Sequence, residues 1–231
     1  MPLVVKLAAH TTEPARVVAA AAKLCYSAAS VNTLYEDLDE TKIRAFLKTL
    51  LDAGHLSPFE HASFTYAIEG VSRVATHQLV RHRIASYSQR SQRYVTMGES
   101  LCVVPPEVEK NPEASRVFRE TAARAYDAYE EMISRGVPKE DARFILPHGW
   151  ETAIVVTMNA RELLHFFGLR LCRRAQWEIR AVARRMLALA VETAGELFEK
   201  SGPPCVYGPC RELHPCGRPF GSVAEVLGDD S

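Results

Sequence analysis

The stretch of sequence that decides the interpretation of this chain reads Arg81-His82-Arg83-Ile84-Ala85-Ser86-Tyr87-Ser88-Gln89-Arg90-Ser91-Gln92-Arg93. Four of these residues are arginines, and no aspartate or glutamate occurs between Arg73 and Met97. Composition alone also fits an irregular surface loop, the usual place of charge-rich segments. However, segments typical of buried structure flank the run, and guanidinium groups that lack carboxylates require another anion. The run therefore predicts a binding site for a phosphate-bearing ligand.

The composition predicts one compact core. Of the 231 residues, 47% are hydrophobic, which is enough for a single core. We expect residues 1–200 to form this core and residues 201–231 to form a tail rich in Cys, Pro and Gly. Lys plus Arg equals Asp plus Glu at 28 each, so no overall field attracts nucleic acid or an anionic membrane. We expect neither of them as a partner.

The cysteines and the apolar stretches predict the cellular location of the protein and the state of its thiols. The chain holds six cysteines, and no charged-then-apolar leader stands at its start. Its longest apolar stretches, such as residues 153–156, are too short to cross a bilayer. We therefore expect a cytoplasmic protein whose thiols are reduced or bound to a metal rather than paired in disulfides.

Hydrophobic periodicity predicts single strands between helices of unequal length. Alternation and β-branched residues indicate strands at residues 3–7, 61–69 and 152–158, with extended chain at 94–104. Helical spacing, caps and terminal Pro or Gly indicate helices at residues 14–26, 39–54, 71–80, 111–132, 160–169 and 175–200. Because strands and helices do not alternate regularly and no glycine-rich phosphate loop is present, the pattern favours an α+β fold over a doubly wound nucleotide fold.

The arginine run also resembles a known signature. The pattern Arg81-His82-Arg83, seven residues, then Ser91-x-Arg93 is similar to the signature of the flavin-dependent thymidylate synthases. The other matching blocks are His55-Leu56-Ser57-Pro58-Phe59-Glu60-His61, Gln78, Asn159-Ala160-Arg161, Leu169-Arg170 and Ala175-Gln176-Trp177-Glu178-Ile179. The resemblance covers residues 1–200 in consistent order, and so widely spaced a motif is specific.

The resemblance implies a fold and a reaction. The fold is α+β, with a mostly antiparallel sheet flanked by long helices. The enzyme is a methyltransferase that makes dTMP from dUMP, taking the carbon from 5,10-methylenetetrahydrofolate and the hydride from reduced FAD, which NADPH regenerates. The family is homotetrameric with active sites at subunit interfaces, so the resemblance also implies self-association.

By position, the resemblance assigns two sets of ligand-binding residues. The residues expected to bind FAD are Ser57, Arg81, His82, Arg83, Gln89, Asn159, Arg161 and His165. The residues expected to bind dUMP are Gln78, Arg81, Gln89, Arg90, Ser91, Gln92, Arg93, Arg143 and Arg170. Arg170 is also the candidate catalytic residue, because a fixed cation beside the uracil ring would stabilise a pyrimidine anion and make C5 more nucleophilic.

This chain departs from the commoner family pattern at three positions, 88, 89 and 174. Many relatives carry Asn-Glu where this chain has Ser88-Gln89, so an amide replaces a carboxylate that would face the flavin or the nucleotide. Arg174 stands where a histidine occurs elsewhere. The resemblance therefore does not determine which contacts Ser88, Gln89 and Arg174 make to the ligands.

The tail contains three of the six cysteines. Cys205, Cys210 and Cys216 lie in a segment too rich in Pro and Gly for a helix and too short for a core of its own. Together with Cys172 they offer four thiolates for a tetrahedral structural zinc, or three plus His214. The alternative is a loop with free thiols, because this spacing is looser than that of familiar zinc sites.

A second class of function also fits the arginine run. Arginines interleaved with tyrosines bind single-stranded nucleic acid through phosphate contacts and stacking. The alternative hypothesis is therefore a non-catalytic nucleotide or nucleic-acid binding module built on residues 81–93. The neutral net charge makes it the weaker of the two.

Overall fold

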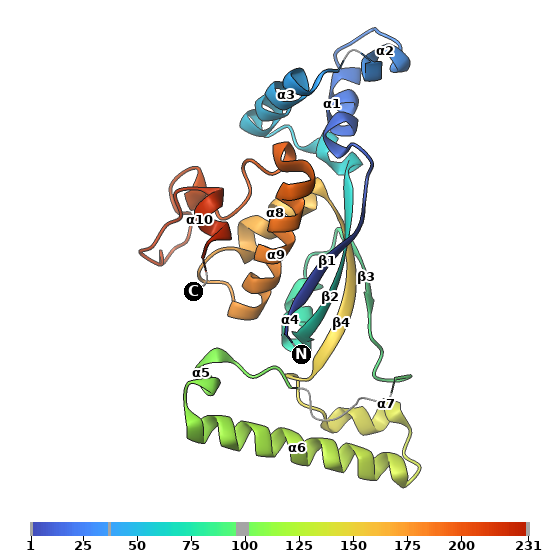
Figure 1. Ribbon diagram of the computed structural model, residues 1–231, viewed down its shortest axis with the longest axis vertical. Helices are drawn as coiled ribbons and strands as arrows, with labels where there is room; N and C mark the ends of the chain where they lie inside the picture. The colour runs from blue at the N-terminus through green and yellow to red at the C-terminus, as the bar shows by residue number, and fades with distance from the viewer. Residues whose placement is uncertain (1, 37, 96–101, 230–231) are drawn as a thin grey trace. The chain divides into compact units, whose positions relative to one another are not determined.

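A four-stranded antiparallel sheet runs through the protein. The computed structural model describes residues 2–36, 38–95 and 102–229 (Figure 1). The strands are β1 (Val4–His10), β2 (Ser63–Ser72), β3 (Ala85–Gln89) and β4 (Glu151–Asn159). Their order in the sheet is β1-β2-β4-β3, so the last strand in sequence lies between β2 and β3. This arrangement, with helices between the strands, confirms the predicted α+β class.

The chain divides into two compact units, each assembled from several segments of sequence. Unit 1 comprises Met1–Val4, Ile68–Arg81 and Tyr87–Val155. Unit 2 comprises Val5–Ala67, His82–Ser86 and Val156–Ser231, so it includes the cysteine-rich tail. The arginine run therefore crosses from one unit to the other twice within a few residues, at position 82 and again at position 87.

Unit 2 holds most of the helices. They are α1 (Pro14–Leu24), α2 (Val31–Glu36), α3 (Glu40–Ala53), α8 (Ala160–Arg170), α9 (Trp177–Ala194) and α10 (Val223–Leu227), with 3-10 turns η1 (Ser57–His61), η3 (Gly195–Leu197) and η4 (Pro204–Val206). Helices α8 and α9 pack side by side (Figure 1). Phe64 of β2 meets Phe198 edge to face at 5.4 Å between ring centroids, and Phe167 of α8 meets the same ring at 6.0 Å. These aromatic contacts join strand and helix in one core.

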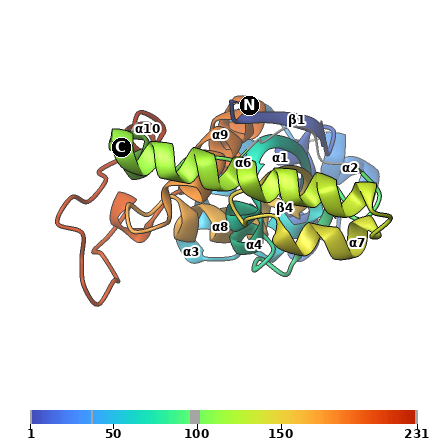
Figure 2. The same cartoon turned by 90° about the horizontal axis from the view of Figure 1, so that it is seen from below.

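Unit 1 is built around one long helix. Its elements are α4 (Arg73–Leu79), α5 (Pro106–Glu109), α6 (Pro112–Ser134), α7 (Lys139–Ala142) and the 3-10 turn η2 (Arg143–Ile145). Helix α6 begins at Pro112, after Asn111 has accepted hydrogen bonds from the next backbone N–H groups, and runs without a break (Figure 2). Its buried Tyr129 packs in a cluster with Ala142 and Trp150. The cluster ties α6 to α7 and to the start of β4.

Most predicted elements are present, with shifted ends. The helix predicted at 71–80 begins only at Arg73, because β2 continues to Ser72 and the Ser72 side chain caps the helix by accepting from the Ala75 N–H. The helix predicted at 175–200 begins at Trp177 and ends at Ala194, where a 3-10 turn follows.

Two other segments differ from the prediction. The extended stretch predicted at 94–104 is wrong at its start, because Tyr94 and Val95 lie in a turn and a bend. Residues 96–101 lie outside the described residues, and Cys102 forms an antiparallel bridge with Trp150. Strand β3 was not predicted, because its sequence Ala-Ser-Tyr-Ser-Gln is polar. Among the described residues, no helix is both long and apolar enough to cross a membrane.

Candidate active site

The centre of the candidate site in unit 2 is a buried histidine. His82 follows α4 and is only 4% exposed. Its ring lies edge to face against Phe166 of α8, with 4.9 Å between centroids, and 5.6 Å from the ring of His165. Burial, and then the nearby Arg170 and His165, lower the pKa of His82 to about 4. The imidazole is therefore neutral at physiological pH.

Both ring nitrogens of His82 have partners on α8. The Nδ1 atom lies 3.1 Å from Oε1 of Glu162, and Nε of Arg170 donates to Nε2 at 3.0 Å. A guanidinium has no acceptor, so Nε2 must be the unprotonated nitrogen. The proton of the neutral ring is then on Nδ1, where it is donated to the Glu162 carboxylate. Glu162 thereby selects the tautomer that can accept from Arg170.

The spacing of α8 explains how one helix provides both partners. Glu162, Phe166 and Arg170 are four residues apart, so they lie on one face of the helix. The helix begins after Asn159, whose side chain accepts from the Glu162 N–H at 2.9 Å. Burial raises the pKa of Glu162, and burial lowers that of Arg170. A carboxylate, a neutral imidazole and a guanidinium thus form a line that ends at the half-buried Arg170.

The same cluster also has the composition of a metal site. Ligand atoms of His82, Glu162 and His165 all lie within 4.8 Å of one another. However, the His82 Nε2 lone pair already accepts from Arg170, and a guanidinium beside it repels a second cation. The hydrogen-bonded line from Glu162 to Arg170 is therefore the better description of this cluster.

Ser57 and Arg161, both expected to bind FAD, line one hollow of unit 2. It has a volume of ≈ 410 Å³, and its wall also includes Cys25 and His55. Arg161 is exposed at the start of α8, where its Nη1 donates to Glu60 of η1. Both residues are therefore accessible to a ligand from the same side.

The other residues of unit 2 expected to bind FAD are spread along its surface. Arg83 and His165 are exposed, and His165 lines the large cavity under the C-terminal tail. Asn159 is half-buried and its side-chain oxygen is used as the cap of α8, which leaves its amide hydrogens for a ligand. Sequence reasoning did not find this capping role.

In unit 1 the positive charge of the arginine run is partly compensated by a carboxylate that is distant in sequence. Arg93 pairs with Glu140 of α7, at 2.7 Å from Nη2 to Oε2, and the Arg143 Nε–H donates to the Glu140 backbone oxygen. Arg81 Nη2 lies 2.7 Å from His77 Nε2. The inference that these guanidiniums lack any carboxylate was wrong for Arg93, because the compensating residue is distant in sequence. The contact nevertheless brings Arg93 and Arg143, two expected dUMP ligands, to one place.

Gln92 shows the clearest sign of an unfilled interaction. Its side chain is 6% exposed, and among the described residues its Nε2 group has no hydrogen-bond partner. Leaving a buried amide donor unpaired costs about 1–3 kcal/mol. Such a donor next to Ser91 and Arg93 suits a polar ligand that enters the site.

The remaining nucleotide-assigned residues vary in exposure. Gln89 is half-buried and donates to the Thr76 and Thr152 hydroxyls at 2.9 and 3.5 Å. Ser91 and Gln78 are also half-buried, whereas Arg90 is exposed. All four belong to unit 1.

The two ligand sets fall largely into different units. Of the residues expected to bind FAD, all but Arg81 and Gln89 belong to unit 2. Of the residues expected to bind dUMP, all but Arg170 belong to unit 1. Arg81 and Gln89 are also the two residues that carry both assignments.

Sequence reasoning missed two residues that orient the others. Glu162 holds His82, and Glu140 holds Arg93 and Arg143. A signal for Glu162 was present, because it is a charged residue on the apolar face of a helix. No comparable signal marked Glu140, which lies on a short exposed turn of helix.

Comparisons with known proteins show which family the sequence matches. Residues 6–194 match the family model described as thymidylate synthase complementing protein. The chain is 51% identical over 224 residues to a flavin-dependent thymidylate synthase of Geobacter sulfurreducens, covering 96% of this chain and 95% of the relative. It is 47% identical to a flavin-dependent thymidylate synthase of Clostridium tetani, with 94% of both chains covered.

A solved structure shares the fold. The UMP/dUMP methylase PolB of Streptomyces cacaoi, crystallised with 5-Br dUMP, superposes with a TM-score of 0.77. The match covers 87% of this chain and 96% of that one at 24% identity. At this level of identity the likeness concerns the fold.

Proposed function

Because this chain belongs to the flavin-dependent thymidylate synthase family, we propose that it is a methyltransferase that converts dUMP to dTMP. The carbon donor is 5,10-methylenetetrahydrofolate, the hydride donor is reduced FAD, and NADPH re-reduces the flavin. Relatives named for this activity cover nearly the whole chain, so the second hypothesis, a non-catalytic nucleic-acid binding module, is not favoured.

The observation that carries the mechanism is the fixed position of Arg170. The Glu162 carboxylate sets the His82 tautomer, and His82 Nε2 accepts from Arg170 Nε. In the complex, the half-buried guanidinium would lie beside the uracil ring. A cation held in advance of the reaction stabilises negative charge on the pyrimidine without reorganisation during the reaction. Arg170 is thus the residue that would raise the nucleophilicity of C5.

The residues of unit 2 suit a dinucleotide cofactor. FAD, when bound, supplies the hydride that completes the methyl group. Arg83 and Arg161 are exposed cations suited to its diphosphate, and Ser57 lines the same hollow as Arg161. His165 is exposed and would offer its ring to the cofactor. These side chains would bind and orient the cofactor.

The residues of unit 1 suit a nucleoside monophosphate. Arg93 and Arg143 meet at Glu140, where a phosphate would compete with the carboxylate for Arg93. The buried Gln92 amide, which has no partner among the described residues, would donate to the nucleotide. A ligand therefore relieves an unfavourable feature of the free protein.

We further propose that the protein is a homotetramer whose active sites lie at subunit interfaces. Three large apolar side chains next to ligand-assigned residues are highly exposed in the single chain: Ile84 at 67%, Tyr94 at 75% and Phe144 at 82%. Such side chains near binding residues are typical of surfaces that another subunit covers. Light scattering of the purified protein tests this; a monomer that is fully active would contradict it. Cell fractionation tests the cytoplasmic location that we also propose.

One experiment tests the activity. The protein is purified, reconstituted with FAD, and assayed for dTMP formation from dUMP and 5,10-methylenetetrahydrofolate, with NADPH and NADH compared as reductants. We expect a yellow protein that forms dTMP. A protein that cannot take up FAD, or that takes it up and forms no dTMP with either reductant, would contradict the proposal.

A matched pair of variants tests the nucleotide assignment. Arg93→Ala is expected to raise the KM for dUMP, because it removes a phosphate-binding guanidinium. Arg116→Ala is the control, since Arg116 is also an exposed, carboxylate-paired arginine of unit 1 but lies on α6. Equal effects of the two substitutions would remove Arg93 from the site.

A further inference from the structure

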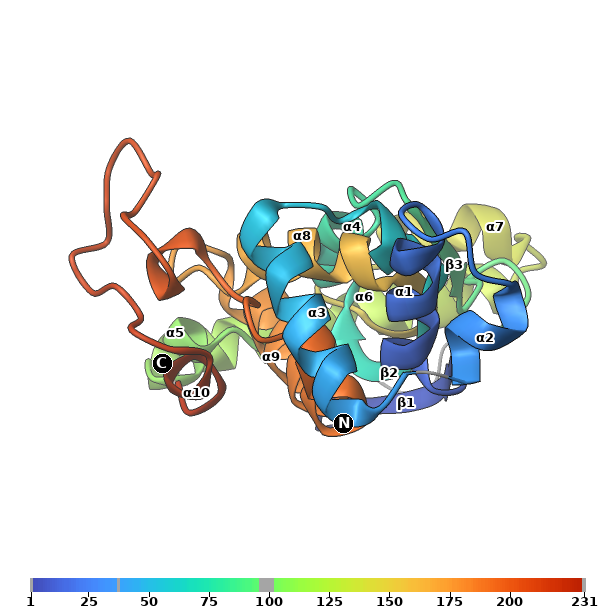
Figure 3. The same cartoon turned by 90° about the horizontal axis from the view of Figure 1, so that it is seen from above.

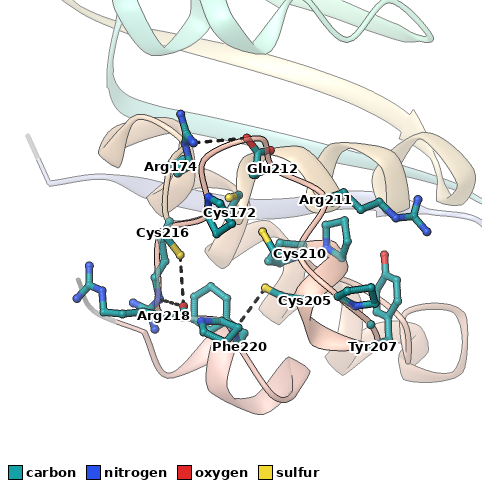
Figure 4. A pocket seen from close by; sticks show the side chains of 18 of the residues that line it. Cys172, Arg174, Cys205, Tyr207, Cys210, Arg211, Glu212, Cys216, Arg218 and Phe220 are labelled. Carbon is teal, nitrogen blue, oxygen red and sulfur yellow. Dashed lines mark hydrogen bonds and ion pairs between the residues drawn. The ribbon is translucent and has the colours of Figure 1, made fainter.

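Four cysteines from separate segments line one cavity of unit 2. Cys172 follows α8, Cys205 lies in η4, and Cys210 and Cys216 lie in the tail beyond it. The cavity has a volume of ≈ 990 Å³ and all four side chains are part of its wall (Figure 4). The other two cysteines of the chain, Cys25 and Cys102, are not part of it. Thiols that converge in this way from distant positions suit a shared ligand.

The tail has little else to hold its middle part. Between η4 and α10 it forms a long loop without regular structure (Figure 3). Its end is anchored, because Phe220 is buried beneath the Arg173 guanidinium at 4.1 Å. Residues 207–219 are exposed, and the Arg174 guanidinium donates to the His214 backbone oxygen. Loops of this length without secondary structure are uncommon in compact domains, and small segments without a core of their own are often held by a cross-link or a metal.

The charges around the cavity suit an anionic metal–thiolate centre. Zinc with four thiolates carries a net charge of about −2. Arg211 and Arg218 line the cavity, and neither makes an ion pair with a carboxylate in the described part of the chain. Arg174 also lines it, at 3.9 Å from Glu212. These cations would offset the charge of the centre.

We propose that this cavity holds one structural zinc ion bound by four thiolates, those of Cys172, Cys205, Cys210 and Cys216. The ion joins the end of α8 to two points of the loop and so fixes the tail. His214 is not a ligand in this arrangement, because its side chain does not line the cavity. This inference is independent of the proposed reaction.

The sulfur atoms must move together to bind the ion. In a tetrahedral site with Zn–S bonds of about 2.3 Å, neighbouring sulfurs are about 3.8 Å apart. Within the described residues, no three of these sulfurs lie within 4.8 Å of one another. A dication binds the thiolate forms, and the irregular loop can close around it.

Metal content tests the proposal directly. The full-length protein is purified under reducing conditions without added metal, then supplied with one zinc equivalent, desalted and analysed by mass spectrometry of the metal. We expect about one zinc per chain in the wild type and in Cys25→Ser, whose exposed thiol lies outside the cavity. We expect loss of zinc in Cys210→Ser and in Cys216→Ser, and retention in His214→Ala. Cobalt in place of zinc should give the visible spectrum of a tetrahedral thiolate site.

A second measurement on the wild type avoids any folding defect of the variants. Arg211 is an exposed trypsin site between Cys210 and Cys216. Chelation of zinc should speed cleavage after Arg211 several-fold without speeding cleavage after Arg116 on α6.

Four outcomes would overturn the proposal. The first three are a wild-type protein with substoichiometric zinc, zinc retained at full stoichiometry in both cysteine variants, and trypsin cleavage after Arg211 that chelation leaves unchanged. The fourth is a disulfide between two tail cysteines under reducing conditions, detected as a mass loss of two hydrogen atoms. The FAD content of each variant is recorded in parallel, so that a failure of the flavin assignment can be distinguished from a failure of the zinc proposal.

Discussion

Substitution of Glu162 tests whether a residue that need not touch either ligand controls the activity. In the Glu162→Leu variant the His82 Nδ1–H loses its acceptor in a position that is 4% exposed. If the ring changes tautomer to avoid this, Nε2 carries the proton and faces the Arg170 Nε–H, so that the 3.0 Å bond is lost instead. In that tautomer Arg170 loses the hydrogen bond that His82 accepts.

The size of the effect follows from the hydrogen bond that is lost. A buried donor without its partner costs about 1–3 kcal/mol, which corresponds to about 5- to 150-fold in rate if the loss falls on the orientation of Arg170. Glu162→Gln keeps an acceptor oxygen and should lie at the low end of this range. The measured quantity is kcat for dTMP formation per bound flavin, because a merely unstable variant loses flavin rather than turnover per flavin.

A double-mutant cycle decides whether Glu162 acts through Arg170. Arg170→Lys and Glu162→Gln are combined, and the free-energy effects on kcat/KM are compared with the sum of the single effects. If Glu162 positions Arg170, the effects are not additive, because the first substitution removes what the second would disturb. Additivity within about 0.5 kcal/mol would refute the reasoning.

Three further predictions follow from the same geometry. Arg170→Ala should abolish most turnover while the protein retains FAD; a wild-type rate would remove Arg170 from its assigned role. Gln92→Met should raise the melting temperature and raise the KM for dUMP, because it removes an unpaired buried amide that the nucleotide would satisfy. The pKa of His82 is lowered to about 4 in the folded protein, below its value of about 6.5 in the unfolded chain. Between these two pH values the unfolded chain therefore binds more protons than the folded protein. The stability that His82 contributes is full above this window and is lost as the pH falls through it. In His82→Gln, denaturant titrations should therefore show a smaller loss of unfolding free energy across that window, by up to about 3 kcal/mol.

The elements that sequence could predict are those whose signals are local. Asn111-Pro112 starts α6, and Gly54 ends α3 with a φ of 71°, a conformation that glycine adopts without strain. Strand β3 was missed because its order comes from pairing with β4 rather than from its own polar residues. A helix cap has a local sequence signal, whereas pairing between distant strands has none.

In the candidate site, too, the features with local sequence signals could be predicted and those that depend on distant residues could not. The motif predicted which residues gather near the ligands, but the carboxylates that orient them come from elsewhere in the chain. Glu162 is 80 residues from His82, and Glu140 is 47 residues from Arg93. A charge count along the run could not include them. The inference of an unbalanced positive patch was therefore too strong, although Gln92 provides independent support for a ligand.

The Ser88-Gln89 departure acquires a physical meaning from these contacts. Gln89 Nε2 donates to the Thr76 hydroxyl, and that hydroxyl donates its own proton to the Arg73 backbone oxygen at 3.2 Å. A glutamate at position 89 cannot donate, so Thr76 would have to abandon Arg73 to satisfy it. We therefore expect Gln89→Glu, which restores the commoner residue, to destabilise this chain by about 1 kcal/mol, the worth of one hydrogen bond. A Gln89→Glu protein at least as stable as the wild type in denaturant titration would show that Gln89 does not depend on these donors.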